Sequence, residues 1–73
     1  MELAERIRKA RVEYLSMTQR ELGDAVGVDP ITVSRWERGV AEPRVRQLRA
    51  LAQLASLPIQ WFYEDDAATA ARV

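Results

Sequence analysis

The chain has 73 residues, and its 11 basic and 11 acidic side chains cancel, so the formal net charge at pH 7 is zero. It contains neither cysteine nor histidine, which excludes disulfides, zinc fingers and catalysis by cysteine or histidine side chains. A chain of this length forms one small domain, and its residue inventory leads us to expect no enzyme, no metal and no cofactor. The longest uncharged stretch, residues 50–63, is too short to span a bilayer. We expect a soluble, cytoplasmic protein without a signal peptide.

The first two helices are predicted from apolar spacing and capping residues. Residues 2–15 repeat apolar side chains at the 3.6-residue period of a helix. A second helix is predicted over residues 18–26, because Thr18 and Glu21 form a capping-box pattern. Gly27 then suits the left-handed position that follows a helix.

The third helix has the clearest end signals. Asp29 is a favourable N-cap, Pro30 suits the first helical position, and Gly39 closes the helix. A short turn joins it to the second helix, as in a helix-turn-helix. Gly23, in the middle of the second helix, costs about 1 kcal/mol relative to alanine, which predicts that another helix packs closely against its backbone.

Two further helices complete the predicted fold. The fourth starts at Pro43 and carries apolar residues up to Ala55, and a short fifth follows Pro58. No window shows the alternation of a β-strand. We therefore predict an all-α domain of five short helices over residues 1–64, and a C-terminal tail, residues 65–73, that frays.

The chemistry is expected on the third helix. In helical projection Val33 and Trp36 share the side that faces the core. The opposite side combines an aliphatic residue, a hydroxyl and two arginines: Ile31, Ser34, Arg35 and Arg38, with Thr32 on its flank. This mixture suits the major groove of DNA, where arginine binds guanine edges and aliphatic groups touch thymine methyls.

Two stretches carry a family resemblance. Thr18-Gln19-x-x-Leu22-Gly23-x-x-Val26-Gly27-Val28 and Thr32-Val33-Ser34-Arg35-Trp36-Glu37-x-Gly39 resemble the helix-turn-helix of the XRE or Cro/CI-type repressors. The resemblance covers about residues 3–63 and implies a lambda-repressor-like DNA-binding domain, with a helix-turn-helix core at residues 18–38. It also implies a sequence-specific transcriptional regulator, a repressor that binds a pseudo-palindromic operator as a dimer. The connection from Tyr14 to Met17 is one residue longer than usual in this family.

The resemblance assigns roles to individual residues by position. The implied base readers are Pro30, Ile31, Thr32 and Arg35. The implied phosphate contacts are Thr18, Gln19, Ser34, Arg38 and Arg44. Arg11 is expected to pair with Glu37 as a structural ion pair. Because Pro30 and Ile31 supply no side-chain hydrogen bonds, Arg35 is left with most of the direct readout.

The fifth helix supplies the expected dimer contact. Trp61 and Phe62 are adjacent, and two adjacent rings cannot both point into the core from one helix. We expect one ring to close the core and the other to contact a second copy, because one recognition helix gives too short a site.

A second interpretation stays open, namely a protein-interaction module. The zero net charge and a pI near 6.2 do not favour tight non-specific binding to DNA. The same scaffold would then present Trp61, Phe62 and the acidic residues 64–66 to another protein, as an antitoxin does. Among regulators, a phage repressor, a restriction–modification controller and an antitoxin-like autorepressor fit equally.

Overall fold

The computed structural model describes residues 2–64, so the tail predicted at residues 65–73 lies outside the described residues. The elements in chain order are α1 (Leu3–Lys9), a π turn η1 (Ala10–Tyr14), α2 (Gln19–Val26), α3 (Pro30–Glu37), α4 (Val45–Ala55) and a 3₁₀ helix η2 (Ile59–Tyr63). Every element in this part of the chain is helical, which confirms the predicted all-α class. Between residues 2 and 64 no helix is long and apolar enough to cross a membrane.

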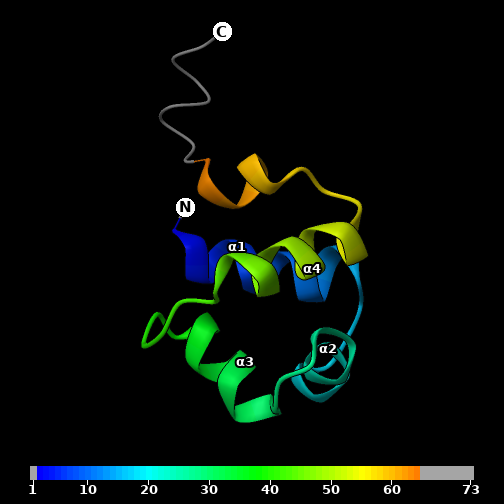
Figure 1. Ribbon diagram of the computed structural model, residues 1–73, viewed down its shortest axis with the longest axis vertical. Coiled ribbons are helices and arrows are strands. Elements are labelled where there is room, and N and C mark those ends of the chain that lie inside the picture. The colour runs from blue at the N-terminus through cyan, green and yellow to red at the C-terminus, as the bar shows by residue number, and fades with distance from the viewer. Residues whose placement is uncertain (1, 65–73) are drawn as a thin grey trace, which may run out of the picture.

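The helices surround one core. In Figure 1, α1 and α4 occupy the middle of the molecule, α2 and α3 lie at its lower end, and η2 lies at its upper end. α2 packs against α3, and α1 packs against both α3 and η2. Buried hydrophobic residues from every element form a single cluster: Ile7, Ala10, Leu22, Val33, Trp36, Leu48, Leu51, Ala52 and Phe62.

The caps of α2 form as predicted. The Thr18 hydroxyl accepts a hydrogen bond from the Glu21 backbone N–H at 3.1 Å. The Glu21 carboxylate accepts one from the Thr18 N–H at 2.9 Å, so two N–H groups without intrahelical partners are satisfied reciprocally. The helix ends at Gly27, whose φ of +83° lies in the left-handed region.

The turn between α2 and α3 explains Gly23. A Cβ atom on Gly23 would lie 2.5 Å from the backbone oxygen of Val28, which is too short for a contact between a Cβ atom and a backbone atom. The element that approaches Gly23 is therefore the connecting turn, and the prediction of a packed helix at this position is wrong. The close approach seats the start of α3 directly against α2.

The α3 helix has the predicted ends. The Asp29 carboxylate accepts a hydrogen bond from the Thr32 N–H at 2.9 Å, and Pro30 is the first helical residue. The helix ends at Glu37, and Gly39 follows in the left-handed conformation with φ +73°. Local capping therefore determines both ends of the expected recognition helix.

The first helix differs from the prediction in its last turn. The α-helix stops at Lys9, and residues 10–14 form a wider π turn in which the Leu15 N–H donates to the Ala10 carbonyl. A π turn takes up an additional residue inside a helix. The connection to α2 then begins at Leu15 and includes Ser16, a left-handed residue with φ +53°.

The last two helices differ in their bounds and type. α4 begins at Val45, two residues later than predicted, because Arg44 is extended with φ −70° and ψ 158°. It ends at Ala55, as expected, and is followed by Ser56, a left-handed residue with φ +57° that the sequence did not signal. The predicted fifth helix is a single 3₁₀ segment, because the Trp61 N–H bonds the carbonyl of Pro58, three residues back.

Candidate nucleic-acid interface

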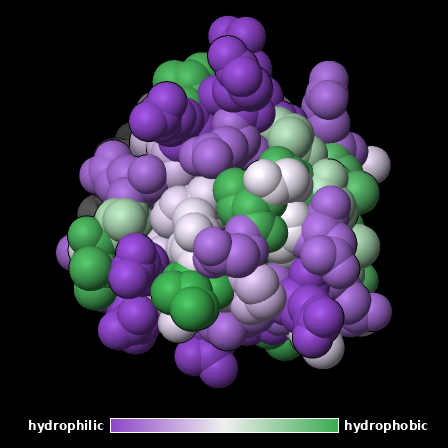
Figure 2. Space-filling model, turned by 60° about the horizontal axis from the view of Figure 1, so that its bottom comes forward, coloured by the Kyte–Doolittle hydropathy of each residue, from purple (hydrophilic) through white to green (hydrophobic). Residues whose placement is uncertain are grey.

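As predicted, one side of α3 faces the core and the opposite side faces the solvent. Val33 is fully buried and Trp36 is 2% exposed, whereas Ile31 on the opposite side is 62% exposed. Arg35 and Arg38 are exposed on the same outer side. Figure 2 shows the end of the molecule that carries α2 and α3, where hydrophilic side chains dominate and hydrophobic ones are scattered among them. The helix thus presents an outer surface that can enter a groove.

The hydroxyl groups of α3 are partly used within the helix. The Thr32 hydroxyl donates to the Asp29 carboxylate at 3.0 Å, which leaves its oxygen free to accept. The Ser34 hydroxyl oxygen accepts from the Arg38 Nε at 3.3 Å, which leaves its proton free to donate. Ser34 can therefore donate to a phosphate, whereas Thr32 can meet a base edge only as an acceptor.

The arginines of this region are exposed and, in the described part of the chain, have no ion-pair partner in direct contact. Among residues 2–64, Arg35, Arg38 and Arg44 form no ion pair. Pro30, which occupies the first position of α3, is also exposed. All four residues lie on α3 or in the segment that leads from it to α4.

The start of α2 offers donors next to this surface. Thr18 is exposed, and its hydroxyl accepts the Glu21 N–H, so the hydroxyl proton is free to donate. Gln19 is half-buried, and its side-chain nitrogen donates to Glu37 at 3.3 Å. No local pattern in the sequence indicates this bond between the start of α2 and the end of α3.

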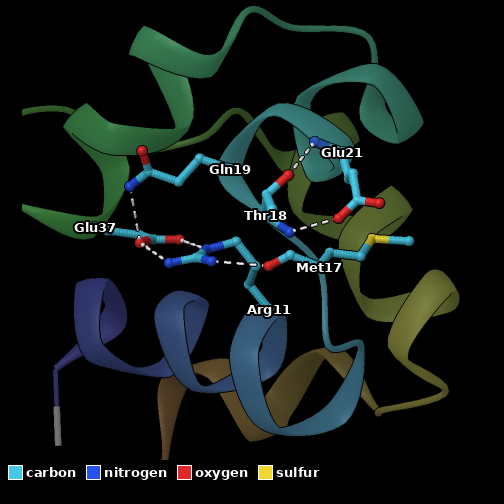
Figure 3. Close-up of polar contacts among 6 residues, drawn as sticks. All are labelled: Arg11, Met17, Thr18, Gln19, Glu21 and Glu37. Carbon is cyan, nitrogen blue, oxygen red and sulfur yellow. Dashed lines mark hydrogen bonds and ion pairs between the residues drawn. The ribbon is translucent and has the colours of Figure 1, made fainter.

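The predicted ion pair is present. Figure 3 shows Arg11 and Glu37 facing one another, with Arg11 Nε 2.6 Å from Glu37 Oε2 and Arg11 Nη2 2.9 Å from Glu37 Oε1. Arg11 Nη1 also donates to the Met17 carbonyl at 2.8 Å. The side chains are 12% and 5% exposed, so a two-pronged pair links η1, the following loop and the end of α3.

Two pKa values are shifted by these contacts. Hydrogen bonding to Glu37 raises the pKa of Arg11, and it outweighs the partial burial that opposes it. Hydrogen bonds from the Thr32 backbone N–H and hydroxyl lower the pKa of Asp29. Asp29 therefore remains an anionic cap at neutral pH, beside the positive end of α3.

The aromatic residues of η2 are divided between core and surface. Phe62 is fully buried, so it is the ring that closes the core, and it has no exposed surface to offer a second copy; of the two expected dimer-contact residues, Phe62 is thereby corrected to a core residue. Trp61 is half-buried and contacts Tyr14, with ring centroids 5.3 Å apart. The guanidinium carbon of Arg6 lies 4.7 Å from the centre of the Trp61 ring, a cation–π contact that was not predicted from the sequence.

Residues 2–64 contain no group of three or more Asp and Glu side chains placed to hold a metal ion. The α2–α3 end exposes arginines and hydrogen-bond donors, which suit an anionic ligand, beside the exposed carboxylates of Glu21, Asp24 and Asp29.

Comparison with known proteins identifies relatives of the same architecture. A family model described as helix-turn-helix matches residues 7–62. The transcriptional regulator DicA of Escherichia coli is 38% identical over 64 residues, which are 88% of this chain and 47% of DicA. Repressor protein C2 of Salmonella phage P22 is 43% identical over 51 residues, which are 70% of this chain and 23% of that repressor. The chain therefore spans at most about half the length of these curated relatives.

A solved structure extends the similarity to three dimensions. The crystal structure of the phage P22 c2 repressor in complex with a synthetic operator superimposes with a TM-score of 0.76 at 34% identity. The match covers 85% of this chain and 92% of that one. The two chains share their fold over nearly all of both.

Proposed function

The chain belongs to the helix-turn-helix family, with the XRE and Cro/CI-type regulators as its relatives, and we propose that it is a sequence-specific, double-stranded-DNA-binding transcriptional repressor. In this proposal α3 lies in the major groove and occupancy of the operator blocks transcription. Pro30, Ile31, Thr32 and Arg35 face the base edges. Thr18, Gln19, Ser34, Arg38 and Arg44 contact phosphates.

One observation carries the proposal, namely the outward side of α3. A helix that only supported the core would expose simple polar residues, but this one exposes Ile31 beside Arg35 and Arg38. Aliphatic and guanidinium groups together can distinguish thymine from guanine. The likeness to a repressor solved with its operator supports the same use of this helix.

The test is a selection of bound sequences from random duplexes, followed by titration of the selected duplex and a scrambled one at fixed salt. We expect one enriched sequence, bound at least about a thousandfold more tightly than the scrambled duplex. Equal affinity for both duplexes would contradict sequence-specific binding. Retention of neither duplex at low salt would contradict DNA binding altogether and favour the protein-interaction module.

We further propose that two copies bind together. A single α3 reads only a few base pairs, and paired recognition helices must lie about 34 Å apart to enter successive major grooves. Trp61, which is half-buried, is the proposed contact now that Phe62 is assigned to the core. Replacing Trp61 by glutamate should weaken both self-association, measured by sedimentation equilibrium, and operator affinity. An unchanged mass and affinity would place the dimer contact elsewhere.

The proposed role is binding, without catalysis. Residues 2–64 supply neither a histidine nor a cysteine, and the interface presents donors and cations to an anionic polymer. A regulator of bacterial or phage genes meets its operator in the cytoplasm, where we propose that this protein acts.

A further inference from the structure

We propose that Glu37 is a positioning residue for DNA binding, which fixes the orientation of the Gln19 side-chain amide and leaves its second N–H group in a defined position to donate to a phosphate. The inference rests on the proposed function and concerns a residue that does not itself contact DNA. It is based on the hydrogen bonds that join η1, α2 and α3.

The carboxylate of Glu37 is shared between two residues, which supply three donor groups. Its Oε1 accepts from Arg11 Nη2 at 2.9 Å and from Gln19 Nε2 at 3.3 Å, while its Oε2 accepts from Arg11 Nε at 2.6 Å. Figure 3 shows the Gln19 amide with its nitrogen toward Glu37 and its oxygen turned away. The amide of α2 is thus bound to the last residue of α3.

The chemistry of the carboxylate permits only this orientation. An ionised carboxylate accepts hydrogen bonds and donates none, whereas an amide has an accepting oxygen and two N–H donors. A flipped Gln19 amide would set its oxygen against Glu37 Oε1, acceptor against acceptor. With the nitrogen toward Glu37, one N–H is used and the second is available to a phosphate oxygen, which is also an acceptor only.

Glu37 can orient Gln19 because it is itself fixed. The carboxylate is 5% exposed and is held on both oxygens by Arg11, which is anchored in turn on the Met17 carbonyl. By contrast, Gln53 and Gln60 are exposed and make no side-chain hydrogen bond within residues 2–64. These two glutamines are free to rotate and serve as internal references.

The first experiment is a double-mutant cycle on operator affinity. Arg11→Met/Glu37→Leu removes both buried charges together, which avoids leaving one charge alone. In the parent background we expect this double substitution to weaken binding about three- to tenfold, the effect of one hydrogen bond. In a Gln19→Ala background it should have no effect, because no amide remains to be oriented. Circular dichroism establishes that each variant is folded.

The second experiment uses the unmutated protein. The side-chain amide of Gln19 should show a high ¹⁵N relaxation order parameter, close to that of rigid backbone, while Gln53 and Gln60 show low values. This measurement does not depend on whether any variant folds.

The outcomes are distinguishable. If Arg11→Met/Glu37→Leu weakened operator binding equally in the parent and in the Gln19→Ala background, the ion pair would have only a general structural role, and the proposal would be overturned. A Gln19 amide as mobile as those of Gln53 and Gln60 would also overturn it. A parent protein that binds no duplex would instead refute the proposed function, and with it this role of Glu37.

Discussion

Replacing Arg35 by alanine separates reading of bases from general attraction to DNA. Arg35 is exposed in the last turn of α3 and makes no ion pair or side-chain hydrogen bond within residues 2–64. Truncation therefore leaves no buried partner behind, and the free energy of unfolding should change by less than about 0.5 kcal/mol. A forked contact from arginine to guanine contributes about 1–3 kcal/mol, so operator affinity should fall about 5- to 150-fold.

The assay titrates the variant against the selected duplex and against each of its single-base-pair variants. Arg35→Ala should lose discrimination at one base pair and keep it at the others. Arg38→Ala should weaken binding uniformly and lower the slope of log affinity against log salt by about one, as expected for a phosphate contact. Arg8→Ala, which removes an exposed cation from α1, is the matched control and should change neither quantity.

Two results would refute this role of Arg35. If Arg35→Ala weakened binding to every duplex by the same factor, Arg35 would contact a phosphate and α3 would sit differently in the groove. If the variant discriminated among all duplexes as the parent does, with unchanged affinity, Arg35 would lie outside the interface.

Three further predictions concern stability. Trp36→Ala should lower the free energy of unfolding by about 3–5 kcal/mol, because removal of a side chain from a residue that is 2% exposed leaves a cavity. If the variant and the parent had the same midpoint of urea denaturation, this prediction would be contradicted. Arg11→Ala should lower the free energy of unfolding by about 3–5 kcal/mol, because it leaves the buried Glu37 carboxylate without its cation. A variant that is as stable as the parent but binds DNA weakly would instead make Arg11 an interface residue. The pKa of Asp29 is lower in the folded protein than in the unfolded chain, where it is about 3.9. Ionised Asp29 therefore stabilises the fold at pH values above about 3.9, and this stabilisation is lost as the pH falls through the pKa of the folded state. Asp29→Asn keeps an acceptor for the Thr32 N–H, so denaturation profiles from neutral to acid pH should show a smaller acid-induced loss of stability.

Features set by local chemistry could be predicted from the sequence, because each depends on residues a few positions apart. The capping box at Thr18, the cap at Asp29 and the left-handed Gly27 all form as expected. The buried side of α3 was also predictable, since Val33 and Trp36 are one turn apart. The pairing of Arg11 with Glu37, 26 residues apart, was implied only by resemblance to a family.

Features set by the path of the backbone were not predictable. The π turn at residues 10–14 and the left-handed Ser56 have no local sequence signal. The bond from Gln19 to Glu37 exists only once α2 and α3 are packed together. These are contacts of tertiary structure, which helix propensity does not encode.

The two adjacent rings of η2 are assigned to core and surface by tertiary contacts of this kind. The adjacency of Trp61 and Phe62 predicted one ring inside and one outside, but which ring turns inward depends on the 3₁₀ geometry of η2 and on the chain that leads into it. The structure buries Phe62 and leaves Trp61 half-exposed, with Tyr14 against its edge and Arg6 over its face. Tyr14, which is 49% exposed, therefore lies directly beside any pairing surface that contains Trp61. Because Tyr14 is the last residue of η1, the π turn that lengthens the first helix helps to shape this surface.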